Sequence, residues 1–322
     1  MHPFIRFVVI AATLALIAWN AAVTLAHSEG TPIPSNTSAL KLDPRLVGYP
    51  EFHIQLTDDA MNVPATASAG RTLVIEENST ESEAHLFVVR VPDHITDDQV
   101  AADMAVAAES VPIEAPTWMF QGLFAGNPDY APIDGGRAAA LVDFVPGRYL
   151  VVDPFRPDIP GRFEVVAATG TPVAETAPEA DARVELFEMN FRLPDEITSG
   201  RQIWEITNAG AGLHEISLIP VPAGATADEA VIALMSTLTG EPIEGQVGPV
   251  WDGWEYITTN GAGVLSPGGT LWAQFDIEPG TYAVACFVPG ANGPHLMEGM
   301  IQLVTVYTDG VDGRGGIATR TV

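Results

Sequence analysis

The chain has 322 residues, of which 14 are basic and 41 are acidic, so its formal net charge at pH 7 is −27. A surface this acidic repels a phosphate backbone, which excludes nucleic acid as a partner. The length suits two domains of about 120 residues each.

Residues 1–26 form an apolar segment that carries a single cation, Arg6, and ends in small residues at Ala26. This pattern is typical of a secretory signal peptide, and a run of roughly 20 apolar residues is also long enough for a retained membrane anchor. We therefore expect an exported protein, either periplasmic, extracellular or membrane-anchored with its domains outside the cytoplasm. Without this segment, 13 basic and 41 acidic residues give a charge of −28. Residues 27–48 are expected to be a flexible lead-in.

The chain repeats itself with an offset near 130 residues. The segment Gly70–Asn78 matches Gly200–Asn208, and His85–Val88 (HLFV) matches His214–Ser217 (HEIS). Both pairs of segments have the pattern of a strand, a turn and a second strand. A repeat of this length indicates two copies of one domain.

A helix is expected in each copy after these strands. Capping boxes open the helices at Thr96-x-x-Gln99 and at Thr226-x-x-Glu229, where the threonine side chain satisfies a free backbone N–H of the first turn. Apolar residues at helical spacing follow in the second copy, namely Val231, Leu234, Met235 and Leu238.

Each copy closes with a Pro-Gly turn and an aromatic strand, Pro146–Asp153 in the first and Pro279–Cys286 in the second. In this alignment Asp153 occupies the position of Cys286. Short strands broken by Gly and Pro, with one helix in each copy, predict an all-β chain of two tandem Greek-key β-sandwiches with short helical insertions. The expected segments are a first domain at 49–168, a linker at 169–182, a second domain at 183–308 and a tail at 309–322.

Cys286 is the only cysteine in the chain, and it opens a Cys-x8-His-x4-Met pattern that contains His295 and Met300. An unpaired cysteine in an exported protein is a buried spectator, a reactive thiol or a metal ligand. With His214 upstream, the chain offers a thiolate, two imidazoles and a thioether. Type 1 copper uses this ligand set, with cysteine and two histidines in a trigonal plane and a weak axial methionine.

The second copy resembles the cupredoxin family, the blue copper proteins, over most of 183–308. The spacing of its ligand loop is similar to that of the type 1 site of copper nitrite reductases. The resemblance implies a cupredoxin-like fold for both copies, with His214, Cys286 and His295 as equatorial copper ligands and Met300 as the axial ligand. The first copy lacks the thiol, the second imidazole and the thioether, so one copper per chain is expected.

Two positions depart from the family pattern. Nitrite reductases and multicopper oxidases have a histidine directly before the ligand cysteine, which links the type 1 copper to a catalytic copper. Here that residue is Ala285, so we expect an electron carrier and not an enzyme. Glu215 stands where many blue copper proteins have asparagine, and it is expected either to lower the reduction potential or to point to solvent.

Several other interpretations stay open. As alternatives to a metal ligand, Cys286 is a small buried apolar residue or the nucleophile of a cysteine hydrolase. The hydrolase is the less favoured of the two, because nothing in the sequence suggests an oxyanion hole. Met297 competes with Met300 as the thioether. His85 is expected to be a structural or surface histidine, and His53 and His94 are candidates for a weak surface metal patch or simply a solvated face.

The whole protein also has an alternative function, as a cupredoxin-like scaffold that carries or buffers copper, or has lost it, without redox turnover. For an electron carrier, the acidic charge predicts a basic redox protein as partner. A membrane is expected to take part only if residues 1–26 are retained as an anchor.

Overall fold

The structure is a computed structural model that describes residues 40–110, 115–133, 135–168, 176–239, 251, 254 and 256–308. The strands of the first copy are β1 (Glu51–Leu56), β2 (Met61–Asn62), β3 (Thr66–Ser68), β4 (Gly70–Asn78), β5 (Phe87–Arg90), β6 (Leu123–Phe124), β7 (Gly136–Phe144), β8 (Gly147–Asp153) and β9 (Arg156–Val166). The strands of the second copy are β10 (Ala182–Phe187), β11 (Asn190–Arg192), β12 (Ile197–Thr198), β13 (Gly200–Asn208), β14 (His214–Val221), β15 (Asn260–Leu265), β16 (Thr270–Ile277), β17 (Gly280–Ala285), β18 (Pro289–Gly290), β19 (Gly293–Pro294) and β20 (Ile301–Tyr307). The helices are α3 (Asp97–Glu109) and α4 (Ala227–Thr239), with 3-10 turns η2 (Pro44–Leu46), η3 (Met119–Gln121) and η4 (His295–Glu298).

The strands follow the apolar patterning of the sequence. In β1, exposed residues alternate with the buried Phe52, Ile54 and Leu56, as expected for a strand with one face on the core. β4 and β13 lie inside a sheet that is covered on both faces, and both are mostly buried along their length. The all-β prediction is confirmed.

Matching hydrogen bonds show that the two copies are built alike. Tyr149 and Tyr282, which follow the two Pro-Gly turns, each donate to the carbonyl four residues earlier, at 3.0 and 2.8 Å. Asn78 and Asn208 each donate from Nδ2 to the carbonyl four residues later, at 2.9 and 2.8 Å. The duplication seen in the sequence is therefore also present in the local structure.

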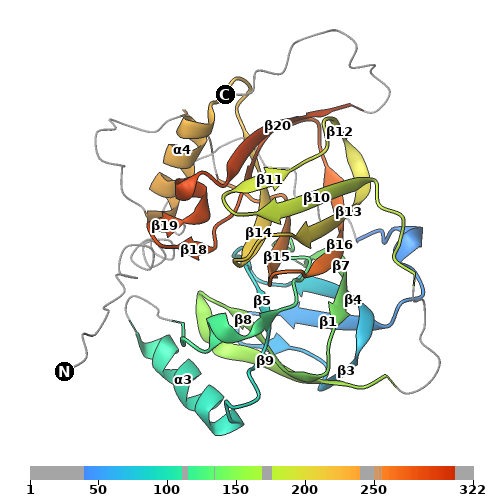
Figure 1. Cartoon of the computed structure of the whole chain (residues 1–322), viewed down its shortest axis with the longest axis vertical. Coiled ribbons are helices and arrows are strands. Elements are labelled where there is room, and N and C mark those ends of the chain that lie inside the picture. Colours follow the sequence, from blue (N-terminus) through green and yellow to red (C-terminus); the bar gives the residue numbers. More distant parts are fainter. Residues whose placement is uncertain are drawn as a thin grey trace.

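One eight-stranded sheet runs through both copies, in the order β11-β10-β13-β16-β7-β4-β1-β2 (Figure 1). Its joint is the antiparallel pairing of β7 with β16, where Ala140 lies opposite Ala273 and both residues are fully buried. β7 and β16 are equivalent strands of the two copies, so the joint has approximate two-fold symmetry. The predicted sandwiches are thus fused through one of their layers.

The other layer consists of two five-stranded sheets, β3-β9-β8-β5-β6 in the first copy and β12-β20-β17-β14-β15 in the second. A β-bridge between Ala125 and Leu265 connects the two sheets across the boundary. Reciprocal bonds between Phe124 and Ser266 extend this contact, with the Phe124 N–H donating to Ser266 Oγ at 2.9 Å and the Ser266 N–H donating to the Phe124 carbonyl at 3.0 Å. Both layers therefore continue from one copy into the other.

Both predicted helix caps are present. The Thr96 hydroxyl accepts the N–H of Gln99 at 3.2 Å, and the Thr226 hydroxyl accepts the N–H of Glu229 at the same distance. Glu229 returns the contact by accepting the N–H of Thr226 at 2.8 Å, which completes a capping box. The helix α3 packs on β9, and α4 packs beside β20.

The strand register corrects one detail of the sequence repeat. The tyrosine after each Pro-Gly turn lies opposite Arg90 in the first copy and opposite Pro220 in the second. Counting back along both strands from these residues makes His85 equivalent to Glu215. The sequence match of His85 with His214 is therefore wrong by one residue. It aligned two histidines because they are the same residue type, whereas the pairing of the strands aligns His85 with Glu215.

The prediction of a flexible lead-in is wrong for its last residues, 40–48. Leu46 in η2 is fully buried in a cluster with residues of both copies, including Leu141 and Trp272. Arg45 forms ion pairs with Asp43 and with Asp181 at the start of the second copy. This segment therefore lies across the joint of the eight-stranded sheet.

Several sequence predictions fall outside the described residues. They concern the signal or anchor at 1–26, residues 27–39 of the lead-in, residues 169–175 of the linker and the tail at 309–322. Within the described part of the chain, no helix is long and apolar enough to cross a membrane. The domain boundaries themselves stay predictions.

Because the joint makes one sheet of two, we predict that the copies unfold together. Leu271 on β16 is fully buried and lies opposite Val142 on β7. We expect Leu271→Ala to lower the free energy of unfolding by about 2–5 kcal/mol, the usual cost of a buried cavity. Hydrogen exchange should then become faster in β4 of the first copy as well as in β13 of the second. Faster exchange confined to the second copy would show that the copies unfold independently.

Candidate metal centre

The four predicted ligands gather at one end of the second sandwich. His214 begins β14, Cys286 directly follows β17, His295 begins η4 and Met300 directly precedes β20. Because β14 and β17 are paired neighbours, the first histidine and the cysteine come from adjacent strands. The other two residues come from the loop that follows Cys286.

This loop folds back so that its two ends meet. The Cys286 N–H donates to the Met300 carbonyl at 3.2 Å, and the Met300 N–H donates to the His295 carbonyl at 2.9 Å. Inside the loop, β18 and β19 form a small hairpin. Gly293 has a φ of 125° there, a backbone conformation that favours glycine. Gly293 thus allows the tight turn of the hairpin.

The possible ligand atoms of His214, Cys286 and His295 all lie within 4.8 Å of one another. Cys286 Sγ and His295 Nδ1 are 3.5 Å apart, and the two imidazole centroids are 5.0 Å apart. Three donors at these separations suit a trigonal metal site. Met300 is fully buried in the cluster that contains Cys286, whereas Met297 is 49% exposed, which favours Met300 as the thioether.

The donor atoms are buried in a way that fits copper. His214 is fully buried, and neither ring nitrogen has a hydrogen-bond partner among the described residues. A buried polar group without a partner costs about 1–3 kcal/mol. Burial lowers the pKa values of His214 and His295, so both rings are held in the neutral form that binds metal. Burial also raises the pKa of the Cys286 thiol well above its usual range, and a bound cation favours the thiolate there.

Glu188, in the turn between β10 and β11, supports His214 from outside. Its Oε1 accepts the N–H groups of Ala211 and Gly212, the latter at 2.8 Å, and lies 3.7 Å from His214 Nε2. The Gly212 bond is the main cause that lowers the pKa of Glu188 to about 2. A Cβ at Gly210 would come within 2.8 Å of Glu188 and 3.0 Å of His214. The glycines before His214 were the only sequence signal for this contact.

Glu215 points into the protein. Glu215 is only 1% exposed, and its Oε1 accepts the N–H of Phe287 at 2.9 Å. Of the two alternatives for Glu215, the one in which it points to solvent is therefore wrong, and a lower reduction potential stays a prediction. Because Phe287 directly follows Cys286, the carboxylate holds the backbone of the ligand loop one residue from the thiol.

The second oxygen of Glu215 faces the first copy. Glu215 Oε2 lies 3.4 Å from His85 Nε2, and Nδ1 of the same ring lies 2.8 Å from Asp129 Oδ2. Burial opposes a charge on His85, but the charges of Asp129 and Glu215 raise its pKa well above the ordinary value. With its side chain only 14% exposed, His85 is an interface residue and not a surface histidine.

Two further carboxyl groups lie in the interface near Asp129. Glu76 on β4 accepts a hydrogen bond from Asn127 Nδ2 at 2.8 Å, and Glu83 accepts the N–H of Thr258 in the second copy at 3.4 Å. Burial is the main cause that raises the pKa of Glu76 to about 8 and that of Glu83 to about 7, and the charge of Asp129 adds to both shifts. Glu76 therefore holds a proton at neutral pH.

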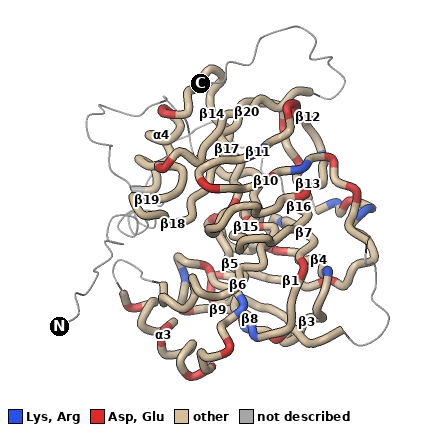
Figure 2. The backbone as a smooth tube through the Cα atoms, viewed as in Figure 1, with Lys and Arg blue, Asp and Glu red and all other residues tan. Residues whose placement is uncertain are grey.

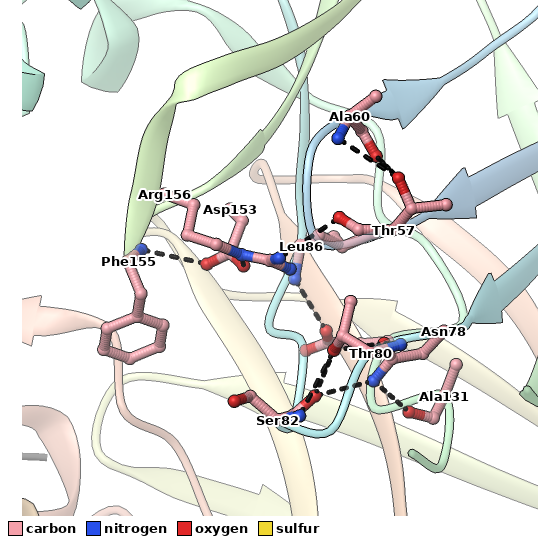
Figure 3. Close-up of polar contacts among 11 residues, drawn as sticks. Thr57, Ala60, Asn78, Thr80, Ser82, Leu86, Ala131, Asp153, Phe155 and Arg156 are labelled. Atoms are coloured by element: carbon pink, nitrogen blue, oxygen red, sulfur yellow. Dashed lines mark hydrogen bonds and ion pairs between the residues drawn. The ribbon is translucent and has the colours of Figure 1, made fainter. Parts of the chain in front are cut away.

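The equivalent end of the first copy contains an ion pair. Asp153, at the position of Cys286, accepts a hydrogen bond from Arg156 Nε at 3.0 Å (Figure 3). By the strand register, Ala84 stands where His214 stands in the second copy. The first copy therefore has neither of these two ligands, and the charge of Asp153 is met by Arg156.

The predicted surface patch gains no support. His53 is exposed and pairs with Glu51 at 2.9 Å. Two groups of the described residues could hold a metal, one at Cys286 and one around His85, and neither includes His53 or His94. Of the two alternatives for His53 and His94, the solvent-exposed face is therefore favoured over the metal patch.

Searches with this sequence find no matching family model and no matching curated protein. Among solved structures, the chain is similar to a reduced auracyanin of Roseiflexus castenholzii, at 19% identity over 38% of this chain and 94% of that one, with a TM-score of 0.26. It is also similar to auracyanin A, a "blue" copper protein of Chloroflexus aurantiacus, at 18% identity over 39% of this chain and 99% of that one, with a TM-score of 0.24. A Cu-containing nitrite reductase of Thermus scotoductus matches at 9% identity over 80% of this chain and 61% of that one, with a TM-score of 0.23.

The chain is cupredoxin-like in its own structure. It has two paired sandwiches, and its second sandwich brings together His214, Cys286 and His295 near the buried Met300.

The interface carboxyl groups predict how stability depends on pH. The pKa of Glu76 in the folded protein, about 8, lies above the ordinary value of a glutamate, so folding retains a proton and stability falls as pH rises toward 8. We expect Glu76→Gln to reduce the loss of unfolding free energy between pH 7 and 9 by about 1 kcal/mol. Denaturant titrations at the two pH values measure this loss.

The matched control is Glu77→Gln on the same strand, where the carboxylate pairs with Arg137 at the surface. It should leave the pH 7 to 9 difference unchanged. Equal effects of the two substitutions would contradict the assignment of the retained proton to Glu76.

Proposed function

We propose that this chain is an exported, mononuclear type 1 copper protein that transfers electrons. In this proposal His214, Cys286 and His295 bind one copper, and Met300 is its weak axial ligand. The observation that carries the proposal is a fully buried thiol beside two neutral imidazoles, one of which has no hydrogen-bond partner among the described residues. Export is proposed from residues 1–26.

The protein's contribution is to hold the ligands still. Bound copper supplies a one-electron couple, which is fast when the ligand set changes little between oxidation states. The hydrogen bonds that join Cys286, His295 and Met300 keep the loop in one shape. Full burial of Cys286 and His214 keeps water away from the thiolate and one imidazole.

His295 is the ligand nearest the surface, at 7% exposed. The hairpin that precedes it brings the exposed Pro289 and the half-buried Gly290 and Pro294 to the same place. We propose this small apolar patch as the docking surface through which the electron passes.

An electron carrier is favoured over an enzyme by Ala285, which stands where a link to a catalytic copper would need a histidine. The alternative is a scaffold that carries or buffers copper. The two differ in behaviour, because a carrier is reduced and oxidised repeatedly without loss of metal and a buffer releases it.

The proposed redox partner is a basic protein. Acidic positions are spread over both halves of the molecule, whereas basic positions are few (Figure 2). Such a surface attracts a basic partner over long range and speeds encounter.

For the copper site, we predict one copper per chain and an intense visible absorption from the thiolate. Cys286→Ser should abolish this absorption. Met300→Leu should keep copper and raise the reduction potential, because a weak thioether no longer stabilises the oxidised ion. Elemental analysis, visible spectra and redox titration give these values. A wild-type protein that shows no such band with Cu(II) would contradict the proposed function.

For the partner, we predict that electron transfer with a basic redox protein becomes slower as ionic strength rises. Salt at 0.1 M screens charge over about 10 Å, so long-range attraction weakens. Stopped-flow rates between low and physiological salt test this, with an acidic redox protein as the matched control. Rates that do not respond to salt would show that the acidic surface does not steer the encounter.

A further inference from the structure

We propose that the first domain sets the reduction potential of the copper site through His85, a positioning residue that is held by Asp129 and keeps Glu215 turned toward the ligand loop. The inference rests on the proposed copper site and extends it. It gives the first domain, which has lost its own ligands, a role in the second.

A continuous chain of contacts leads from the first domain to the thiol. Asp129 lies 2.8 Å from His85 Nδ1, and Glu215 lies 3.4 Å from His85 Nε2. Glu215 then accepts the N–H of Phe287 at 2.9 Å, next to Cys286. Every link is buried or nearly so, so each interaction is weakly screened by water.

Charge, more than hydrogen-bond alignment, holds the three groups together. His85 Nδ1, Asp129 Oδ2 and Glu215 Oε2 are buried atoms without an aligned hydrogen bond among the described residues, although their separations are those of ion pairs. Two buried carboxylates on one imidazole need its positive charge. Without that charge, Glu215 has no reason to stay between the two domains.

The arrangement is that of a bridging imidazolium and not of a metal chelate. The same three residues could bring one atom each to a cation. However, Asp129 and Glu215 lie closest to different nitrogens of the His85 ring, and a single cation binds only one of them. The ring therefore takes the cation's place between the carboxylates.

The backbone that presents Asp129 is itself unusual. Asp129 and Tyr130 have φ values of 49° and 54°, which non-glycine residues rarely adopt and which persist where the surroundings enforce them. The Tyr130 ring lies 5.1 Å from the His85 ring, and its hydroxyl accepts a hydrogen bond from Ser217 Oγ at 3.3 Å. The second domain thus helps to fix the turn that places Asp129.

A double-mutant cycle tests whether His85 acts through Glu215. The variants are His85→Gln, Glu215→Gln and their combination, and the readout is the reduction potential of the copper protein. With His85 present, the carboxylate of Glu215 is held beside the ligand loop, where its negative charge stabilises oxidised copper. We expect His85→Gln to release Glu215 from the loop and to shift the redox equilibrium about tenfold toward the reduced form, which is about 59 mV for one electron.

In the Glu215→Gln background, the same change should shift the equilibrium less than about twofold, because the coupling partner is gone. His53→Gln is the matched control, since His53 also pairs with a glutamate at 2.9 Å but at the surface, and it should not change the potential. Equal shifts in both backgrounds, no shift, or a shift toward the oxidised form would overturn the proposal.

A second readout does not need copper. Hydrogen exchange at the Phe287 amide in the metal-free protein should become about tenfold faster in His85→Gln and in Asp129→Asn, and stay unchanged in His53→Gln. If the wild type binds no copper, the proposed function fails and this exchange still decides the inference. Unchanged exchange in both variants overturns it, and so does a second metal in the wild type that both variants lose.

Discussion

The antiparallel pairing of β7 with β16 is the contact on which the rest of the molecule depends. It converts the two halves into one sheet, with Ala140 against Ala273 at its centre. Since both layers continue across the boundary, the two halves have one fixed relative position. That position places His85 of one half against Glu215 of the other, and a looser arrangement of the halves could not hold two buried charged side chains at ion-pair distance.

The two halves divide the work that a cupredoxin-like site requires. The second supplies the thiol, both imidazoles and the buried thioether, all at one end of its sandwich. The first replaces the cysteine by Asp153, whose charge is met by Arg156, and contributes charged groups to the interface. The first copy still contacts the site of the second, because His85 pairs with Glu215, which accepts the N–H of Phe287 in the ligand loop.

Much of this could be predicted from local sequence. The Cys-x8-His-x4-Met pattern identified residues that the structure brings together, and the capping boxes at Thr96 and Thr226 begin real helices. The joint could not be predicted, because β7 and β16 read as ordinary apolar strands and nothing local marks an edge as paired. Glu188 and Asp129 were missed since single acidic residues in turns are common, and only the fold shows where their carboxylates go.

The near two-fold symmetry of the joint brings equivalent positions of the two copies face to face, and a duplicated chain can place different residues at such positions. Positions 85 and 215 are equivalent and face each other across the boundary. In a dimer of identical subunits, such a position meets its own copy, so two glutamates or two histidines would repel each other there. One gene that encodes both halves removes this restriction, and opposite charges become available at a place where a symmetric assembly could only have used a neutral residue.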